Sequence, residues 1–393
     1  MYGPIGLPTA RDEPERGDKG RDQHLLYYLG SYLQEHIAAL SFLRLLDSIS
    51  FRALGGAITA MLFTISFGGR IILALYRSGR RDKSRSYDHF PVTGKGATKT
   101  YGGPLVVASI VSSVLLWGKL HNPFTLICLF AVFWFACLGY IDDHLKVRHG
   151  ASDHGLSETA KLALQLLYGI GFGLFFVVEG WSPMPPGLAT QLFVPFFKAP
   201  VIDLGWGYIP FIIFTVIAIS NSVNIADGID GLAIVPVAFV VAVYAVFAYV
   251  SSHTGMAGFL IFPVVPGVGE VAIICSTVFG ACLGFLWFNS YPANVIMGDT
   301  GSMALGGLVG TIVVLVKQEF LFLIVGGIFV TEALSVVIQE KVGIKWLGRR
   351  FFLSAPIHHH FQSRGLADTK IVIRFWIVAG ILALAGLATL KIR

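Results

Sequence analysis

Long apolar segments recur along most of the chain, and they restrict its fold more than any other feature. The first covers about residues 52–76, "RALGGAITAMLFTISFGGRIILALY". Similar segments follow at about 102–120, 124–141, 159–179, 207–225, 231–251, 269–288, 302–317, 319–338 and 371–390. A helix needs about 20 apolar residues to cross a bilayer. The sequence therefore predicts an all-α polytopic membrane protein with about ten transmembrane helices.

The composition agrees with this fold class. Hydrophobic residues make up 55% of the chain and charged residues only 13%, whereas soluble domains carry about 25% charged residues. Together with the length of the apolar segments, this argues against a large soluble core. The four cysteines lie in apolar segments without a CxxC pair, which indicates packing residues rather than disulfides or metal ligands.

Basic residues gather in alternate connecting segments. They are densest in residues 77–99, recur at Lys146 and Arg148, and return between Lys341 and Lys370. The positive-inside rule then places the segments after spans one, three, five, seven and nine in the cytoplasm, with both termini external. We interpret the net charge of +6 as a sign of this topology rather than of nucleic-acid binding.

The N-terminal region differs from the rest. Residues 1–24 are polar and rich in Gly, Pro and charge, so we expect a disordered tail without a signal peptide. Residues 25–51 mix leucines with polar groups at helical spacing, which suggests an amphipathic segment at the membrane interface. Residues 52–393 then form the transmembrane domain.

Polar motifs sort to one side of this topology. Five segments fall on the predicted cytoplasmic face, and the external side offers nothing comparable. They read "GKGATKTYGG", "GYIDDHLKVRHG", "NSVNIADGIDGL", "NSYPANVIMGDTGS" and "LSAPIHHHFQSRG". We expect them to form one composite site.

The first carboxylate candidates are Asp142 and Asp143, which end a predicted span. Acids at a helix C-terminus oppose the macrodipole, which argues against a purely structural role. Adjacent carboxylates suit a divalent cation or proton exchange with a phosphate. A solvated helix end is the structural alternative.

The motif "NSVNIADGIDGL" places polar side chains at intervals of three, so they would share one face of a helix. These residues are Asn221, Asn224, Asp227 and Asp230. Hard oxygen ligands suit magnesium bound to phosphates, and the spacing of a calcium loop is absent. A capped structural turn is the alternative.

Two further motifs suggest anion binding. "MGDTGS" puts Asp299 just before a new span, where backbone N–H groups attract phosphate; a simple N-cap is the alternative. "GKGATKTYGG" is not a Walker loop, but Lys95 and Thr100 could contact a phosphate or a base. Solvated lysines are the alternative.

The run "PIHHHF" at residues 356–361 carries three histidines. Zinc ligands usually stand at i and i+3 or i+4, and HExxH is absent. Arg349, Arg350 and Arg364 are near in sequence and favour an anion. We therefore interpret the run as a loop that contacts phosphate or substrate, with metal binding or no chemistry as alternatives. Together, carboxylates for Mg²⁺ and donors for phosphates at a membrane face are typical of phosphoryl transfer with a lipid-borne partner.

From about residue 52 onward the sequence resembles the bacterial phospho-N-acetylmuramoyl-pentapeptide transferases, within the polyprenyl-phosphate N-acetylhexosamine-1-phosphate transferase superfamily. The resemblance rests on "YIDDHLKV", "NSVNIADGIDGL", "NSYPANVIMGDTGS" and "APIHHHF" in that order. The histidine motif distinguishes this family from its hexosamine-1-phosphate relatives. One departure is in the first loop, where Lys99 replaces proline and Tyr101 replaces methionine.

The resemblance implies a reaction of peptidoglycan synthesis. Undecaprenyl phosphate and UDP-MurNAc-pentapeptide would give lipid I and UMP with Mg²⁺, in the bacterial inner membrane, with a homodimer as one open arrangement. The implied catalytic residues are Asp142, Asp143, Asp299 and His358, and the implied metal ligands are Asp299 and Asp227. The expected substrate contacts are Lys95, Thr100, Asn221, Asn224, Asp227, Asp230, Gly298, Ser302, Gln339, Ala355, His359 and His360. Alternatives are a related transferase that uses UDP-GlcNAc and, from another class, a secondary transporter.

Overall fold

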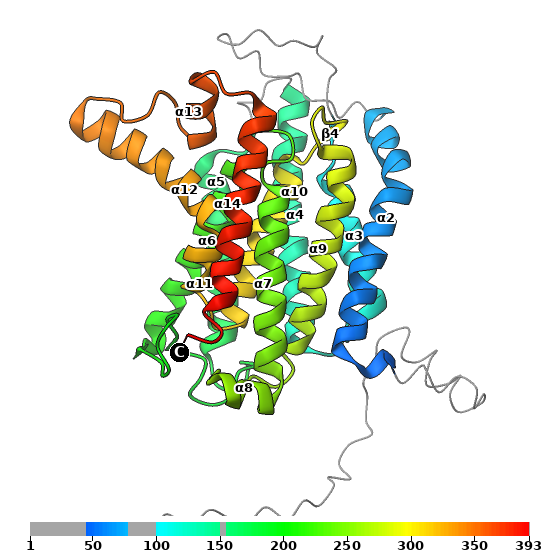
Figure 1. Ribbon diagram of the computed structural model, residues 1–393, viewed down its shortest axis with the longest axis vertical. Helices are drawn as coiled ribbons and strands as arrows, with labels where there is room; N and C mark the ends of the chain where they lie inside the picture. The colour runs from blue at the N-terminus through cyan, green and yellow to red at the C-terminus, as the bar shows by residue number, and fades with distance from the viewer. Residues whose placement is uncertain (1–44, 78–99, 150–154, 393) are drawn as a thin grey trace, which may run out of the picture.

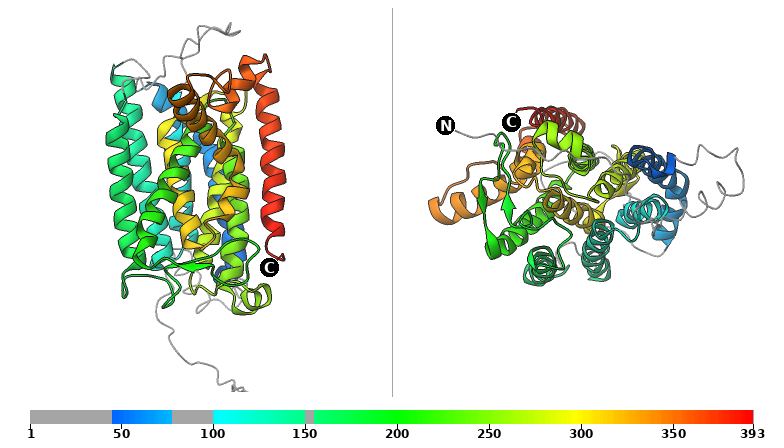
Figure 2. Two further views of the ribbon diagram at one scale, coloured as in Figure 1. Left: turned by 90° about the vertical axis from the view of Figure 1, so that its left-hand side faces the viewer. Right: turned by 90° about the horizontal axis from the view of Figure 1, so that it is seen from below.

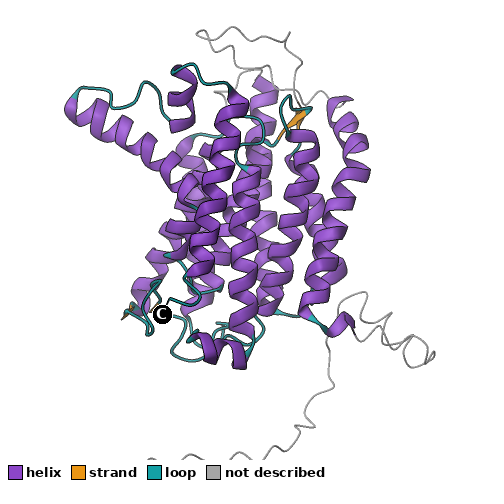
Figure 3. Cartoon of the chain, in the orientation of Figure 1, coloured by secondary structure: helices purple, strands orange, loops and turns teal. Residues whose placement is uncertain are grey.

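The structure is a computed structural model that describes residues 45–77, 100–149 and 155–392. The predicted tail 1–24, most of the predicted interfacial segment 25–51, and Lys95 lie outside these residues. Most of the described chain is helical (Figure 3). Eight of its helices are long and apolar enough to cross a membrane. They are α2 (Ile49–Arg77), α4 (Pro123–His149), α5 (Glu158–Val177), α6 (Tyr208–Ala226), α7 (Ile234–Ser252), α9 (Gly269–Asn289), α10 (Gly298–Leu315) and α14 (Asp368–Ala388).

Two predicted spans take other forms. The second becomes α3 (Gly103–Trp117), only 15 residues long. The ninth is interrupted at Gly326, giving α11 (Leu321–Val325), α12 (Gly327–Val337) and the π-helix η3 (Ile338–Trp346). A Cβ atom at Gly326 would lie 2.5 Å from the Phe322 ring. The arm formed by α12 and η3 leaves the bundle (Figure 1). The chain is thus a polytopic helical membrane protein, and ten crossings stay a prediction.

Short strands tie the loops together. β1 (Thr100–Tyr101) pairs in parallel with β4 (Val295–Ile296), and the Gly102 N–H donates to the Ile296 carbonyl at 2.6 Å. This joins the end of the first loop to the segment before α10. At the other end of the bundle, β2 (Gln191–Leu192) and β3 (Ile202–Asp203) form an antiparallel pair. The remaining elements are η2 (Gly205–Gly207), α8 (Thr254–Leu260) and α13 (Ile357–Ser363).

Helix α10 forms the centre of the bundle (Figure 2), and every residue from Thr300 to Leu315 is buried. Its glycines permit close approach of neighbouring helices. A Cβ at Gly307 would lie 2.2 Å from the Phe135 ring of α4, and one at Gly306 would lie 2.9 Å from the Ser220 Cα of α6. Small residues are the usual means by which membrane helices pack this closely. This packing fixes the N-terminus of α10 beside α4.

The polar motifs meet at one end of the bundle. In Figure 1, β4, α13 and the start of α10 lie at the top, while the start of α2, α8 and the C-terminus lie at the bottom. The motifs therefore share one end, as expected. Which side of a membrane this end faces stays a prediction.

The opposite end also contains buried charges, contrary to the expectation that it offers nothing comparable. Arg52 donates to both carboxylate oxygens of Glu270 at 2.9 and 2.6 Å. Lys317 donates to the Tyr208 hydroxyl at 2.6 Å and lies 3.7 Å from Glu319. The sequence did not reveal these groups as partners, because Arg52 and Glu270 are 218 residues apart.

Candidate active site

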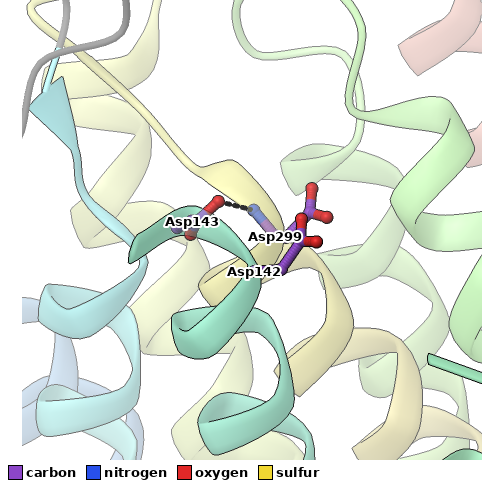
Figure 4. Close-up of side chains that lie close together, drawn as sticks. All are labelled: Asp142, Asp143 and Asp299. Atoms are coloured by element: carbon purple, nitrogen blue, oxygen red, sulfur yellow. Dashed lines mark hydrogen bonds between the residues drawn. The ribbon is translucent and has the colours of Figure 1, made fainter. Parts of the chain in front are cut away.

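Three carboxylates converge where α4 meets the N-terminus of α10. One oxygen each from Asp142, Asp143 and Asp299 lies within 4.8 Å of the others, and Figure 4 shows the three side chains together. Two predicted motifs 157 residues apart along the chain therefore contribute to one cluster. One premise of the prediction was wrong: α4 continues to His149, so the aspartate pair lies inside the helix and not at its C-terminus.

Asp143 is fully engaged with the first turn of α10. Its Oδ1 accepts from the Asp299 N–H at 3.0 Å. Its Oδ2 accepts from the N–H and hydroxyl of Thr300 at 2.8 and 2.6 Å. The first N–H groups of a helix have no intrahelical partner and attract negative charge. Asp143 therefore caps α10 from another helix.

Asp142 and Asp299 share two lysines instead. Lys146 Nζ lies 2.7 Å from Asp142 Oδ2 and 3.1 Å from Asp299 Oδ2. Lys161 Nζ lies 3.0 and 2.9 Å from the same two oxygens. The other oxygen of Asp142 accepts from the Leu156 N–H at 2.7 Å. Two positive charges therefore occupy the space between these carboxylates.

Asn224 and Ser302 complete the surroundings of Asp299. The Asn224 amide donates to Asp299 Oδ1 at 3.1 Å and to the Ser302 hydroxyl at 2.8 Å, and Ser302 donates to the Gly298 carbonyl at 2.9 Å. Gly298 has φ +68, and a Cβ there would lie 2.5 Å from Tyr101. The structure thus brings these three predicted residues to the cluster.

The rest of the asparagine-rich motif is more dispersed. Helix α6 ends at Ala226, so Asp227 is its C-cap and Asp230 lies beyond it; the expected single helical face was wrong for these two. Burial, followed by the charges of Asp299, Asp143 and Asp230, raises the pKa of Asp227 to about 8. Asp230 accepts from the Ala293 N–H at 3.1 Å. Asn221 pairs with Gln165 of α5 at 2.9 Å.

The three histidines lie in the short helix α13, not in a loop as expected, and each has different surroundings. His358 is completely buried, with Nδ1 3.0 Å from Glu332 Oε2. His359 Nδ1 lies 2.6 Å from Gln362 Oε1. His360 Nδ1 accepts from the Leu353 N–H at 3.1 Å, and burial together with Arg364 lowers the pKa of His360.

Gln339 supports the segment that leads to this helix. Its Oε1 accepts from the N–H groups of Phe351 and Phe352, both at 3.0 Å. Ala355 lies in the turn before α13. Thr100 contributes the first residue of β1, opposite Val295. The substrate contacts predicted for these residues stay predictions.

A small open pocket adjoins the carboxylates. Asp143 and Thr300 line it, and its remaining walls come from α2, β1, α3 and α4. Those wall residues are Leu75, Tyr101, Pro104, Tyr140, His144 and Val147. The cavity is mainly apolar beside a strongly charged cluster.

Comparison with known proteins gives a consistent family assignment. The chain is 42% identical over 370 residues to the phospho-N-acetylmuramoyl-pentapeptide-transferase of Citrifermentans bemidjiense, covering 94% of this chain and 99% of that relative. It is 43% identical over 372 residues to the protein of the same name from Solidesulfovibrio magneticus, covering 94% and 100%. This chain belongs to the phospho-N-acetylmuramoyl-pentapeptide-transferase family. The model of glycosyl transferase family 4 also matches residues 125–317.

Residues 125–317, which match the glycosyl transferase model, contain the whole carboxylate cluster. Within this member of the phospho-N-acetylmuramoyl-pentapeptide-transferase family, the cluster suits a divalent cation. Carboxylate oxygens are the hard ligands that Mg²⁺ prefers, and two ammonium groups already lie between Asp142 and Asp299. Burial is the first cause of the raised pKa of Asp227 and nearby negative charge is the second; a cation would relieve the second cause. Asp143 fits less well, because both of its oxygens accept hydrogen bonds from α10.

Sequence reasoning missed three charged residues of this site. Lys146 was read only as a topology signal, although its i+4 spacing from Asp142 would allow a helical ion pair. Lys161 comes from α5, and no local pattern connects it with either carboxylate. Glu332 lies within an apolar segment and was not singled out, yet it is buried against His358. These partners depend on tertiary packing.

Proposed function

We propose that this protein transfers the phospho-MurNAc-pentapeptide group of UDP-MurNAc-pentapeptide to undecaprenyl phosphate, with lipid I and UMP as products. The observation that carries the proposal is the near full-length identity of 42% to relatives named for this activity. The clustered carboxylates and lysines at one end of a membrane bundle support it. The apolar cavity beside Asp143 is compatible with a lipid-borne substrate.

In the proposed reaction, an oxygen of the lipid phosphate bonds to the β-phosphorus of the nucleotide sugar. The bond from that phosphorus to the bridging oxygen breaks, and UMP leaves with the electron pair. Asp142 is the better candidate to take the proton of the lipid phosphate, because Asp143 is committed to three hydrogen bonds. Lys146 and Lys161 bring positive charge to a site that receives several phosphate charges.

We further propose that Asp299 and Asp227 hold Mg²⁺, because the charge of Asp299 acts on the Asp227 carboxyl. A divalent cation at this position neutralises phosphate charge when it is bound. Asn224 then orients Asp299 through the 3.1 Å hydrogen bond to Oδ1. Lys95, Thr100, Asn221, Asp230, Gln339, Ala355, His359 and His360 are proposed substrate contacts.

Two assays test the proposal. Purified protein in detergent should release UMP only when both substrates and Mg²⁺ are present, and absence of UMP under these conditions would refute the activity. Competition between UDP-MurNAc-pentapeptide and UDP-GlcNAc should leave the product unchanged. Incorporation of GlcNAc instead would favour the related hexosamine-1-phosphate transferases.

We also propose that the chain crosses the bacterial inner membrane ten times, with α3 and the interrupted α11–α12 segment as the two shorter passes. The carboxylate end would face the cytoplasm, and the termini would lie outside. The supporting pattern is the concentration of Lys and Arg in the segments at the carboxylate end. A homodimer is a further proposal that sedimentation in detergent would test.

A further inference from the structure

A buried ion-pair partner lies behind the histidine motif. Glu332 of α12 and His358 of α13 are both completely buried, and Oε2 of the glutamate lies 3.0 Å from Nδ1 of the histidine. An ionised carboxylate only accepts hydrogen bonds. Nδ1 therefore carries the hydrogen when Glu332 is ionised, and a protonated Glu332 would instead donate to Nδ1. Glu332 thus fixes the orientation of the imidazole ring.

The other ring nitrogen faces the asparagine-rich motif. His358 Nε2 is buried and has no hydrogen-bond partner within the described part of the chain. A Cβ atom at Gly228 would lie only 2.3 Å from this nitrogen. Gly228 is the neighbour of Asp227, so the imidazole packs directly beneath the segment from Asp227 to Asp230. The segment can occupy this position only because residue 228 has no side chain.

Losing the carboxylate would release the ring. Without an acceptor at Nδ1, the imidazole could rotate and present a different edge to Gly228, and the segment above it would shift. Displacements of about 1 Å at a catalytic site can cost about 100-fold in rate. For histidines that bind metals, removing the partner that orients the ring commonly costs about 10- to 100-fold in affinity or activity, and we take the same scale for His358.

We propose that Glu332 is a positioning residue that acts through His358 to hold the Asp227–Asp230 segment in place for the nucleotide sugar. This inference rests on the proposed function. Within the described residues, the Glu332 carboxylate makes its hydrogen bond to His358 and to no other side chain, so we expect its influence to pass through the imidazole. Glu332 therefore orients the ring of His358, and that ring supports Gly228 and its neighbours.

The test measures the Kd of UDP-MurNAc-pentapeptide by calorimetry, because binding stays measurable in variants that do not turn over. We expect Glu332→Leu to weaken binding about 10-fold or more. Glu332→Gln should stay within about threefold of the parent protein, since its amide oxygen still accepts from Nδ1. The matched control is Glu340→Gln, an exposed glutamate on the same arm, which should leave Kd and turnover unchanged.

A double-variant cycle separates positioning from general structural support. In a His358→Ala background, Glu332→Leu should cause no further loss, because the ring through which it acts is gone. Gly228→Ala should weaken binding in the parent protein but much less in the His358→Ala background. It serves as the second probe if Glu332→Leu does not fold.

The cycle also yields outcomes that overturn the inference. The first is that Glu332→Leu weakens nucleotide-sugar binding equally in the parent protein and in the His358→Ala variant. The others are unchanged binding in His358→Ala and normal binding in folded Glu332→Leu. Failure of the proposed function is distinguishable, because the parent protein would then neither bind the nucleotide sugar nor release UMP.

Discussion

Adjacent aspartates at residues 142 and 143 have different roles because they point to different partners. Asp143 accepts three hydrogen bonds from the first turn of α10, whereas Asp142 faces Lys146 and Lys161. The same functional group thus stabilises a helix at one position and contributes to a charge cluster at the next. Single substitutions should separate these roles.

Asp143→Asn should lower the thermal unfolding midpoint, because one amide oxygen cannot replace both carboxylate acceptors. Leaving buried donors without partners costs about 1–3 kcal/mol. Asp142→Asn should instead reduce UMP release by at least about 100-fold, as expected for loss of a general base, with a smaller change in midpoint. Thermal unfolding in detergent and a UMP assay measure the two effects. Equal midpoints for both variants would contradict the separate roles.

Lys161→Gln should lower the Mg²⁺ concentration that gives half-maximal turnover. The Lys161 ammonium lies 3.0 and 2.9 Å from Asp142 and Asp299, so it competes with a cation for the Asp299 oxygen. One partly exposed ion pair is worth about 1 kcal/mol, which corresponds to a shift of about fivefold. A Mg²⁺ titration of turnover measures it, with exposed Lys198→Gln as the control. A higher Mg²⁺ requirement would contradict the prediction.

The pKa of Asp227 leads to a prediction about pH. It is raised from 3.8 to about 8, so the folded state binds more protons than the unfolded state between these values. The stability of the metal-free protein should therefore fall as pH rises through this window, by at most about 1.4 kcal/mol per pH unit for this group. Asp227→Asn should flatten the profile of unfolding midpoints from pH 5 to 8 in EDTA. The control variant Asp203→Asn should leave the profile unchanged, because that carboxyl is exposed and its pKa is lowered. An unchanged slope in Asp227→Asn would refute the raised pKa of Asp227.

Residue patterns in the sequence found part of this site. The aspartate pair, Asn224 and Asp299 were recognisable because each belongs to a polar motif at the end of an apolar segment. Lys161 was not, because its distance to Asp299 depends on how α5 packs beside α4. The burial of His358 was also hidden, because sequence places a histidine near a site without showing which partner its ring will face.

Helix boundaries were likewise only partly predictable from the sequence. Apolar length located α10, but its start at Gly298 rather than near residue 302 depends on the cap from Asp143. The expected ninth span is interrupted where Gly326 packs against Phe322. Hydropathy averages over such positions, so it finds apolar segments more reliably than their breaks.

Close packing of α10 leads to a prediction for Gly307. A Cβ there would lie 2.2 Å from the Phe135 ring, so Gly307→Ala should force α4 and α10 apart. Overpacking of this kind costs about 1–3 kcal/mol and should lower both the unfolding midpoint and UMP release, because the carboxylates come from these two helices. Gly171→Ala in α5 is the matched control, since no atom of the described residues lies within 4 Å of its Cβ position. Equal midpoints for the two variants would argue against this role of Gly307.

The whole molecule has two chemically distinct ends. One carries the carboxylate cluster and α13 (Figure 1), and the basic residues Arg349 and Arg364 flank α13 in the sequence. At the other end, the buried charges of Arg52 and Lys317 contact protein partners. Sequence charge alone predicted this polarity, because basic residues alternate between connecting segments. It could not show that both ends contain buried ions, since these form only when distant helices meet.

The polarity predicts which end a membrane-impermeant maleimide can reach. Arg364→Cys, exposed at the carboxylate end, should react in inside-out vesicles and be protected in right-side-out vesicles, because basic segments stay in the cytoplasm. Lys391→Cys, exposed near the C-terminus, should show the reverse. The parent chain is the control, because Cys128, Cys275 and Cys282 are buried and Cys137 lies within the membrane-crossing part of α4. Labelling of Arg364→Cys in right-side-out vesicles would show the opposite topology. The carboxylates would then lie outside the cell, away from any cytoplasmic supply of a nucleotide sugar.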